Sequence, residues 1–575
     1  MLKLKKFLRP YIAIILIVFV LTFLQSIAQL YLPTLMSDIV DTGIVQADVP
    51  YILKTGAFML AVALFGSACM VFASFFASRS GTGFAPDIRS AIFRRVEQFS
   101  LHEFDSIGTA SLITRTTNDV TQVHQVTVMI LRMMIMAPMM AIGGIIMAVS
   151  KDARLSLVFL VSLPVLAGFI TFLATKSIPL FQMMQEKLDV LNRVLRERLA
   201  GVRVVRALNR TDHEEKRFAA SSGDLMKTAI KVMSLLASLF PVMMLLMNLT
   251  AVALVWFGAV RIDQGTMQVG DMMALIQYAM QIMFSLLMAA MMFVMVPRAS
   301  ASAKRINDVL ETDPEIVDPD ILETIGEMRG YVEFKNVTFS YPGAEAPAIR
   351  DITFSASPGE ITAVIGGTGS GKSTLVNLIL RFYDVDSGAV LVDGIDVRKT
   401  LQKQLRSRIG YVPQSSVLFS GSISENVRYG NAGAGNEDIR AALETAQATE
   451  FVDSIDEGAE STIAQGGTNI SGGQKQRLSI ARALVRRPEV YIFDDSFSAL
   501  DFKTDARLRA ALRNEIEDAT MFIVAQRVAT IMRADRIIVL DDGEICGIGT
   551  HKELLETCDV YKQIVLSQLS LEEIA

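Results

Sequence analysis

Residues 361–374 read ITAVIGGTGSGKST, and this stretch indicates how the C-terminal half of the chain folds. It contains the pattern G-x-x-x-x-G-K-[ST] at 366–373, after an apolar run at 361–365 and before a second one at 374–382. A strand, a glycine-rich loop and a helix in this order are typical of a phosphate-binding loop. A chance glycine-rich turn would need neither the flanking elements nor the Lys-Ser pair, so we interpret the stretch as a phosphate site.

The residue types of this loop suit a phosphate ligand. Glycines allow main-chain N–H groups to surround phosphate oxygens, and the N-terminus of the following helix adds partial positive charge. We expect Lys372 to contact the β- and γ-phosphates of a nucleotide and the Ser373 hydroxyl to bind Mg²⁺. The predicted nucleotide site consists of Gly366, Gly367, Thr368, Gly369, Ser370, Gly371, Lys372, Ser373 and Thr374.

A second motif, VYIFDD at 490–495, supplies a carboxylate at the end of an apolar strand. In phosphate-loop proteins an Asp in this place holds Mg²⁺. The alternative is a solvated Asp at a strand end, but the position downstream of the phosphate loop favours the metal role. We therefore expect Asp494 to share the metal with Ser373.

The region around these motifs has the pattern of an α/β domain. From residue 331 onward, short β-branched runs such as YVEFKNVTF, IGYVPQ and RIIVLDDGEI alternate with polar or helical stretches. Strands that alternate with helices predict a mainly parallel sheet. We assign this domain to 331–575.

The N-terminal half is membrane-like. A bilayer core about 30 Å thick needs about 20 apolar residues of helix. The overall composition, 51% hydrophobic and 20% charged, fits a chain that is part membrane and part globular. A net charge of −5 gives no indication of a nucleic-acid partner, and three cysteines form no disulfide or zinc pattern. Six segments suit spans: 11–37, 55–78, 133–150, 155–175, 232–260 and 272–297.

The flanking charges predict the orientation of these spans. Lys and Arg gather before the first span and after the second, fourth and sixth, whereas the first outer loop carries Asp. We therefore expect a multi-pass protein of the cell (plasma) membrane with both termini and the α/β domain in the cytoplasm. The charged connections 79–125 and 176–231 have helical apolar spacing, so we expect the spans to continue as helices there. The membrane domain is assigned to 1–303, and 304–330 to a short helix and linker.

With ISGGQKQR at 470–477 added, the motifs resemble those of an ATP-binding-cassette (ABC) exporter half-transporter, and the match covers essentially the whole chain. The resemblance implies an all-α transmembrane domain of six helices fused to a cytosolic α/β P-loop nucleotide-binding domain. It also implies ATP and Mg²⁺ as ligands and ATP-hydrolysing translocation across a membrane as the activity.

The resemblance assigns further roles residue by residue. Tyr341 in FSYPG matches the aromatic residue that stacks on adenine, and Gln414 in YVPQ matches a glutamine that contacts Mg²⁺. Asp501 in SALD matches an acid that crosses the dimer interface, and 104–120 and 201–210 look like loops that dock on nucleotide domains. The signature motif, which binds the γ-phosphate of ATP held by a partner, is matched by Ser471, Gly472, Gly473 and Gln474.

The chain departs from the family pattern at the hydrolytic positions. Asp495 stands where Glu usually polarises the attacking water, and Gln526 stands where a His usually contacts the γ-phosphate. Gln465 replaces another Glu, and Ile470 replaces a Leu. The Asp carboxylate is one methylene shorter, and a neutral amide has no imidazolium form. Neutral drift in an active homodimer is one reading of these changes.

The interpretation that we favour is the degenerate subunit of a heterodimeric exporter. The site on this chain's phosphate loop would bind ATP and hydrolyse it poorly, while its intact signature completes the hydrolytic site of a second half-transporter chain. The alternatives are an active homodimeric lipid or drug exporter, an ATP-gated regulator or channel, and an importer. The last two are disfavoured because no long regulatory insert precedes 331 and because the two domains are fused.

The sequence says least about the cargo. Methionine, present 30 times and frequent in 272–297, suits either a pocket that repacks around varied apolar ligands or lipid-facing filler. Arg132 lies close to the third span and is either functional or extended to the membrane interface. Because few polar residues occur in the spans, we expect a hydrophobic or amphipathic drug or lipid in contact with the bilayer.

Overall fold

The computed structural model describes residues 2–319, 321, 323, 329–515 and 518–568. The chain divides into two compact units. The first contains Met1–Glu97 and Thr109–Thr312, and the second contains Gln98–Gly108 and Asp313–Ala575.

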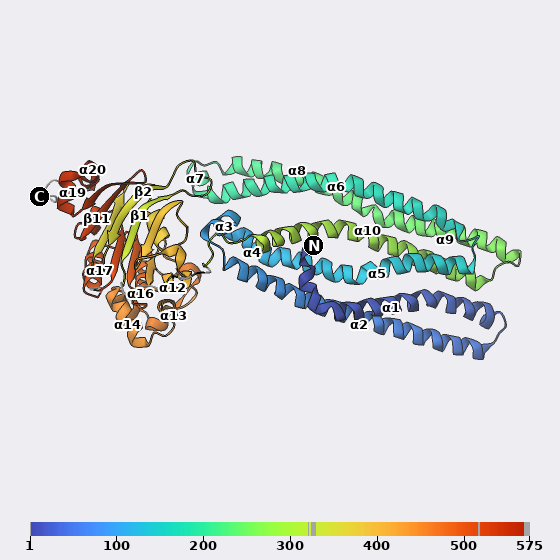
Figure 1. Ribbon diagram of the computed structural model, residues 1–575. Coiled ribbons are helices and arrows are strands. Elements are labelled where there is room, and N and C mark those ends of the chain that lie inside the picture. The colour runs from blue at the N-terminus through green and yellow to red at the C-terminus, as the bar shows by residue number, and fades with distance from the viewer. Residues whose placement is uncertain (1, 320, 322, 324–328, 516–517, 569–575) are drawn as a thin grey trace. The chain divides into compact units, whose positions relative to one another are not determined.

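The first unit is a bundle of long helices that run side by side (Figure 1). Contacts within it pair α1 with α2, α5 with α10, and α6 with α8. Its elements are η1 (Leu2–Tyr11), α1 (Ile12–Asp38), η2 (Ile39–Ile44), α2 (Val49–Val96), α4 (Thr109–Thr114), η3 (Arg115–Asp119), α5 (Val120–Lys151), α6 (Leu157–Ala200), α7 (Val202–Ala207), α8 (Thr211–Ala237), α9 (Leu239–Asp263) and α10 (Val269–Glu311).

Six helical segments of the described chain are long and apolar enough to cross a membrane. Each covers one predicted span, except that the fourth begins at Leu157, two residues after the predicted start, and each is longer than the span. The second, Val49–Val96, has 48 residues and is therefore about 70 Å long. The prediction that the spans continue as helices through the charged connections is confirmed. Helix α5 begins upstream of the third predicted span, so that Arg132 lies inside it. The segments are Lys3–Ile44, Val49–Val96, Thr109–Lys151, Leu157–Ala200, Thr211–Asp263 and Val269–Glu311.

The second unit is the predicted α/β domain, so the fold class is confirmed. Its main sheet has the order β12-β11-β3-β10-β9-β6, in which only β12 is antiparallel to its neighbour. The strands are β1 (Val332–Phe339), β2 (Ile349–Ala356), β3 (Ile361–Gly366), β4 (Ser387–Val392), β5 (Ile395–Asp396), β6 (Ile409–Val412), β7 (Gly421–Ser422), β8 (Thr462–Ile463), β9 (Val490–Asp494), β10 (Thr520–Val524), β11 (Arg536–Asp541) and β12 (Glu544–Gly549).

The sequence analysis missed a second sheet. Strands β2, β1, β4 and β5 form an antiparallel sheet that packs its buried face on one side of the main sheet. Strand β2 was overlooked because exposed residues separate its buried ones, such as Ile352 and Phe354, so that the segment contains no continuous β-branched run. On the other side of the main sheet, helices and β-strands share a second core, which includes Val412, Phe493 and Tyr561.

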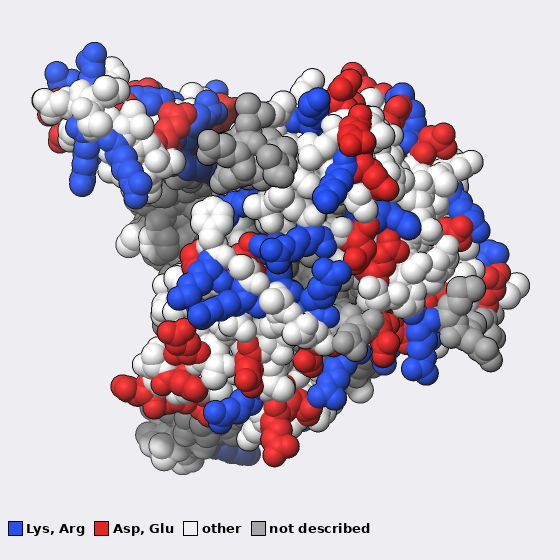
Figure 2. Space-filling model, turned by 90° about the vertical axis from the view of Figure 1, so that its left-hand side faces the viewer, with Lys and Arg blue, Asp and Glu red and all other residues white. Residues whose placement is uncertain are grey.

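The helices of the second unit are mostly short. They are α3 (Leu101–Ile107), α11 (Lys372–Ile379), η4 (Val397–Lys399), α12 (Gln402–Ser407), α13 (Ile423–Arg428), α14 (Asn436–Thr445), α15 (Thr449–Asp453), η5 (Gly458–Glu460), η6 (Gln465–Gly467), α16 (Gly472–Leu484), α17 (Phe502–Glu515), α18 (Val528–Ile531), α19 (His551–Thr557) and α20 (Asp559–Gln568). Figure 2 shows basic and acidic side chains interspersed over one face of the molecule, as is usual for a surface in contact with water.

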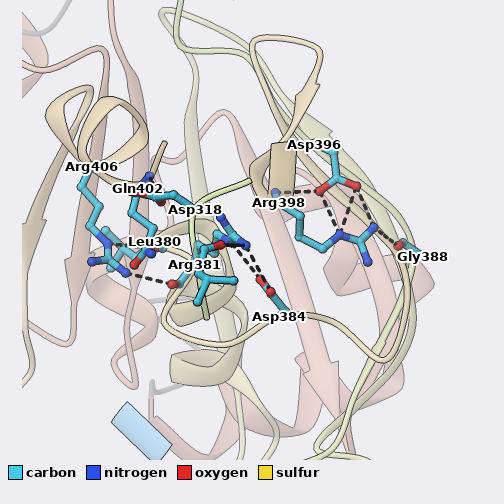
Figure 3. A network of polar contacts seen from close by, with 10 residues as sticks. Asp318, Leu380, Arg381, Asp384, Gly388, Asp396, Arg398, Gln402 and Arg406 are labelled. Atoms are coloured by element: carbon cyan, nitrogen blue, oxygen red, sulfur yellow. Dashed lines mark hydrogen bonds and ion pairs between the residues drawn. The ribbon is translucent and has the colours of Figure 1, made fainter. Parts of the chain in front are cut away.

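The segment assigned to a linker has more structure than predicted. Helix α10 continues past the expected domain boundary at 303 to Glu311. Beyond it, the Val317 carbonyl accepts a hydrogen bond from Arg381 Nη2 at 3.2 Å, and Asp318 Oδ1 accepts one from the Gln402 N–H at 2.9 Å (Figure 3). Linker positions 320, 322 and 324–328 lie outside the described residues. The first part of the linker is thus fixed to the α/β domain.

Arg381 is the centre of this polar network. Its guanidinium bonds both carboxylate oxygens of Asp384, and only 3% of the residue is exposed. Arg406 donates to the carbonyls of Leu380 and Arg381, at 3.1 and 2.9 Å, and so caps the end of the chain turn that follows α11 (Figure 3). The helix that starts at the phosphate loop is therefore anchored at its far end by two arginines.

Arg381→Ala is expected to destabilise the α/β domain by about 2 kcal/mol, because it removes a buried side chain that packs in the domain and leaves partly buried acceptors without a donor. The matched control is Arg350→Ala, whose ion pair with Glu544 joins two exposed side chains and should contribute less than about 0.5 kcal/mol. Differential scanning calorimetry of the full chain measures both. Equal unfolding temperatures for the two variants would contradict the role given to Arg381.

Candidate functional site

The carboxyl ends of four parallel strands bring the predicted site together. Strands β3, β10, β9 and β6 are consecutive neighbours in the main sheet and run in the same direction. The phosphate loop follows β3, and a loop containing Gln526 follows β10; Asp494 ends β9, and Gln414 follows β6. Motifs that are separated by more than a hundred residues therefore meet at one edge of the sheet, which is the usual place for a ligand in such folds.

The glycines of the phosphate loop are required by its geometry. Gly371 has φ +95°, and a Cβ at this position would lie 2.8 Å from the Ala348 carbonyl oxygen. A Cβ at Gly366 would clash with the Leu540 carbonyl oxygen. A Cβ at Gly367 or Gly369 would have no atom of the described residues within 4 Å. The outer part of the loop is therefore open for main-chain N–H groups to approach a ligand, whereas its ends are packed tightly.

Lys372 is held under this loop. Its Nζ donates to the carbonyls of Gly366 at 3.0 Å and Gly367 at 2.5 Å, and only 9% of the residue is exposed. Burial lowers the pKa of the Lys372 ammonium, while the nearby carboxylates of Asp495 and Asp494 oppose that change. A partly desolvated cation beside a loop of N–H groups is suited to a polyanionic ligand.

Two of the three predicted metal ligands, Ser373 and Asp494, lie side by side, whereas the third, Gln414, bonds Asp495. Ser373 Oγ is 3.2 Å from Asp494 Oδ1, and Asp494 is 4% exposed. Two oxygens at this spacing fit neighbouring positions around Mg²⁺, whose ligands lie at about 2.0–2.1 Å in octahedral geometry. Few carboxylates are needed, because Mg²⁺ retains waters and takes further oxygens from phosphates. The residues present therefore fit Mg²⁺.

Asp495 and Gln526, the two residues that depart from the family pattern at the hydrolytic positions, contact each other. Asp495 Oδ2 accepts hydrogen bonds from Gln526 Nε2 at 3.1 Å and from Gln414 Nε2 at 3.4 Å. The backbone of Asp495 has φ +46°, which is uncommon for a residue other than glycine. The sequence analysis singled out all three residues separately, and the structure places them in one cluster.

The two acidic residues after β9 differ in what acts on them. Burial raises the pKa of Asp494, and the Ser373 hydroxyl and Lys372 oppose that rise, while the Asp495 charge adds to it. Burial also raises the pKa of Asp495, against the hydrogen bond from Gln414 and the charges of Arg527 and Lys372. Both carboxylates are thus more costly to ionise than in water, and a cation bound between them and phosphate would favour their charged forms.

Tyr341 lies next to the start of the phosphate-loop helix. Its hydroxyl is 3.0 Å from Thr374 Oγ1, and its ring makes edge-on contacts with Phe339 and Tyr383. These contacts fix the orientation of the ring, and the residue remains half-buried. A fixed, partly exposed aromatic ring is suited to stacking on a planar base.

The signature residues form a separate site at the start of α16. Ser471 caps this helix: its Oγ accepts from the Gln474 N–H at 3.3 Å, and Gln474 Oε1 accepts from the Ser471 N–H at 2.8 Å. Ser471 and Gly472 are exposed. A Cβ at Gly472 would meet none of the described atoms within 4 Å, whereas one at Gly473 would lie 3.1 Å from the Ala499 carbonyl oxygen. Among the described residues, no hydrogen bond joins this helix start to the phosphate loop.

Polar contacts in the first unit were not foreseen from the sequence. Tyr278 on α10 is fully buried and bonds Thr34 and the Leu30 carbonyl of α1 at 2.8 and 3.0 Å. Lys151 at the end of α5 forms an ion pair with Asp271 of α10 at 2.9 Å and donates a hydrogen bond to Ser37 of α1. The signal was present, since a Tyr or a Lys within an apolar run commonly has a polar partner on a neighbouring helix.

Lys372→Ala is expected to weaken MgATP binding to the purified chain by about 10- to 100-fold, because hydrogen bonds to a charged group contribute about 1.5–3 kcal/mol. Lys335→Ala is the control, since Lys335 is exposed on β1 and pairs with Glu333. Equilibrium binding of a fluorescent ATP analogue measures both variants. Unchanged affinity in Lys372→Ala would show that the phosphates bind elsewhere.

Family comparisons match both units. The family model described as "ABC transporter transmembrane region" matches residues 15–286, and the one described as "ABC transporter" matches residues 349–498. The second range includes the phosphate loop, Gln414, the signature and Asp494.

Individual relatives match nearly the whole chain. An uncharacterized ABC transporter ATP-binding protein of Mycobacterium tuberculosis is 44% identical over 570 residues, 98% of this chain and 97% of the relative. A fatty acid ABC transporter ATP-binding/permease protein of the same species is 33% identical and covers 83% of this chain and 75% of the relative. The solved structure of a bacterial Atm1-family ABC exporter with ATP bound shares the fold, with a TM-score of 0.78, 23% identity and 99% of both chains covered.

Proposed function

The chain belongs to the ABC transporter family and has the fold of an exporter with fused transmembrane and ATP-binding domains, and on this basis we propose that it is half of a heterodimer that exports amphipathic lipids or drugs. ABC exporters are dimeric, ATP-hydrolysing membrane proteins. The proposal adds the kind of dimer, the division of work between its two ATP sites and the class of cargo. It places the protein in the cell membrane, with the ATP-binding domain and both termini in the cytoplasm, as the flanking charges favour.

The observation that carries the heterodimer is the cluster around Asp495. A carboxylate that activates water must reach it, and an error of about 1 Å can cost about 10²-fold in rate. Asp495 has a shorter side chain than the usual Glu, and two side-chain amides already bond its Oδ2. The cluster therefore supports a site that binds MgATP through Lys372, Ser373 and Asp494 but hydrolyses it slowly.

Gln526 supports the same interpretation. Its amide can donate to a phosphate oxygen or to Asp495, but it cannot carry the positive charge of a protonated His. Both departures lie in the site on this chain's own phosphate loop. The signature at Ser471, in contrast, keeps the usual small residues and an exposed surface, which suits completion of a hydrolytic site whose phosphate loop belongs to another chain.

An apolar depression in the first unit supports an amphipathic cargo. It is open to the surface, has a volume of about 350 Å³ and lies on α5 and α10, where Met133, Met134 and Met292 line it together with Pro138 and Pro297. Flexible methionine side chains adapt to apolar ligands of different shape. The relative named as a fatty acid transporter handles a ligand of this chemistry, so we place the cargo among molecules with a long apolar part.

Transport into sealed vesicles tests the proposal. The chain is reconstituted with a second half-transporter that carries the usual Glu and His, and ATP-dependent movement of a fluorescent fatty acid or lipophilic dye is recorded. We expect transport from the pair and little from this chain alone. Equal transport by this chain alone would favour the homodimeric exporter, and ATP hydrolysis without movement of either probe would reject the cargo class.

A further inference from the structure

The C-terminal helix α20 touches the ATP site through one side chain, Gln568. The Gln568 amide makes two hydrogen bonds to the loop after β10: its Nε2 donates to the Gln526 carbonyl at 2.8 Å, and its Oε1 accepts from the Val528 N–H at 2.8 Å. The two bonds hold the main chain on both sides of Arg527, as hydrogen bonds from a neighbouring strand would. A side-chain amide in this place holds the main chain of three successive residues.

The helix that carries Gln568 is firmly docked. Tyr561 and Val565 are fully buried in the core beside the main sheet. Residues 561, 565 and 568 follow the i, i+4, i+7 spacing of one helix face, so Gln568 lies on the face that packs against the domain. The Tyr561 hydroxyl is also 2.7 Å from His551 Nδ1 of α19. Gln568 itself is exposed, but the helix that carries it is anchored in the core by Tyr561 and Val565.

The loop it holds carries the side chain that meets Asp495. Gln526 Nε2 donates to Asp495 Oδ2 at 3.1 Å. The neighbouring Arg527 donates to the Ser498 carbonyl at 3.0 Å, and its guanidinium lies over the Phe502 ring. The main chain at 526–528 is thus fixed from one side by the segment after β9 and from the other by α20.

We propose that Gln568 is a positioning residue for the Gln526 amide, so that docking of α20 controls how this chain's site recognises the terminal phosphate of ATP. Gln526 is exposed, and the side-chain contact that orients its amide is the hydrogen bond to Asp495. Its direction depends on the main chain that carries it, and Gln568 holds that main chain on both sides of Arg527. The proposal rests on the placement of Gln526 near the γ-phosphate, which is part of the proposed function.

The hydrogen bonds themselves are tested by amide hydrogen exchange on the full chain in detergent or lipid nanodiscs. Gln568→Met keeps the length of the side chain and removes both bonds. Exchange of the Val528 amide should become about 3- to 10-fold faster, as expected for loss of one intramolecular hydrogen bond. Gln563→Ala, an exposed residue on the same helix, is the control and should leave this exchange unchanged. Unchanged exchange in Gln568→Met would overturn the contact.

The functional role is tested by the ratio of MgATP to MgADP affinity, which does not require hydrolysis. Gln526→Ala should lower the preference for MgATP about threefold or more, and Gln568→Met should do the same while MgADP affinity stays constant. The double variant should be no worse than Gln526→Ala alone. Additive losses, or a preference unchanged by Gln568→Met, would overturn the positioning role. A preference unchanged by Gln526→Ala would instead reject the placement of Gln526 in the proposed site.

Discussion

Ser471→Arg is expected to lower the ATPase rate of the assembled heterodimer by about 10²–10³-fold, the usual cost of losing one donor to developing charge. Ser471 caps α16 and is exposed beside Gly472, where a Cβ would have no atom of the described residues within 4 Å. A bulky cation there would keep the signature from closing on the γ-phosphate of ATP held by the partner. The steady-state ATPase rate and the cargo efflux of the heterodimer measure the effect.

Asp495→Asn is the contrasting variant for this prediction. It removes a carboxylate that the proposal regards as already misplaced, so the heterodimer should lose less than about fivefold in rate. Gln474→Ala serves as a milder control at the signature, because it removes only one half of the capping box. Loss of turnover in Asp495→Asn with normal turnover in Ser471→Arg would reverse the assignment of the two sites.

Asp495→Glu combined with Gln526→His is expected to raise the ATPase rate of the chain purified alone by up to about 10²-fold. Two copies of this variant would contain the phosphate loop, the metal ligands, an intact signature and the two restored groups. The longer carboxylate would reach the attacking water, and the imidazole would supply the contact that the amide lacks. Vanadate-sensitive phosphate release at saturating MgATP measures the gain.

The single variants separate the two contributions to this gain. Asp495→Glu alone should give most of it, because activation of water by a general base contributes about 10²–10⁴-fold to a rate. A double variant that additionally carries Lys372→Ala should return to the rate of the unmodified chain. No gain in the double variant would indicate that another departure, such as Gln465, also limits the site.

The sequence predicted those parts of the fold that depend on long, repeated patterns. Six apolar segments and the order strand, loop, helix around Lys372 required only local residue types, and both are present in the structure. The antiparallel sheet was missed because β2 is half polar, and because its pairing with β1 is a contact that no local pattern encodes. The docked start of the linker was missed for the same reason, since its partners Arg381 and Gln402 lie far along the chain.

The candidate site was also predictable only in part from the sequence. The residues of the phosphate loop and of the signature follow from motifs, but their mutual arrangement does not. That Gln414 and Gln526 both donate to Asp495 follows from the order of β6, β9 and β10 in the sheet, which the sequence analysis did not predict. The contact of Gln568 with 526–528 depends on how α20 docks, and a single polar residue near the chain end gives no signal of it.

The central claim is that this chain's own site binds ATP and cleaves it slowly. A single-turnover experiment tests it most directly: radiolabelled ATP is mixed with excess purified chain and Mg²⁺, and the products are separated after quenching. The Lys372→Ala variant is the control, because it should bind little nucleotide. Labelled ATP that binds to the unmodified chain but not to this variant is bound at this site. An ordinary rate of about 10 s⁻¹ would consume the bound ATP within about one second. The account predicts that most of it is still ATP at that time, and rapid, complete conversion to ADP would contradict it.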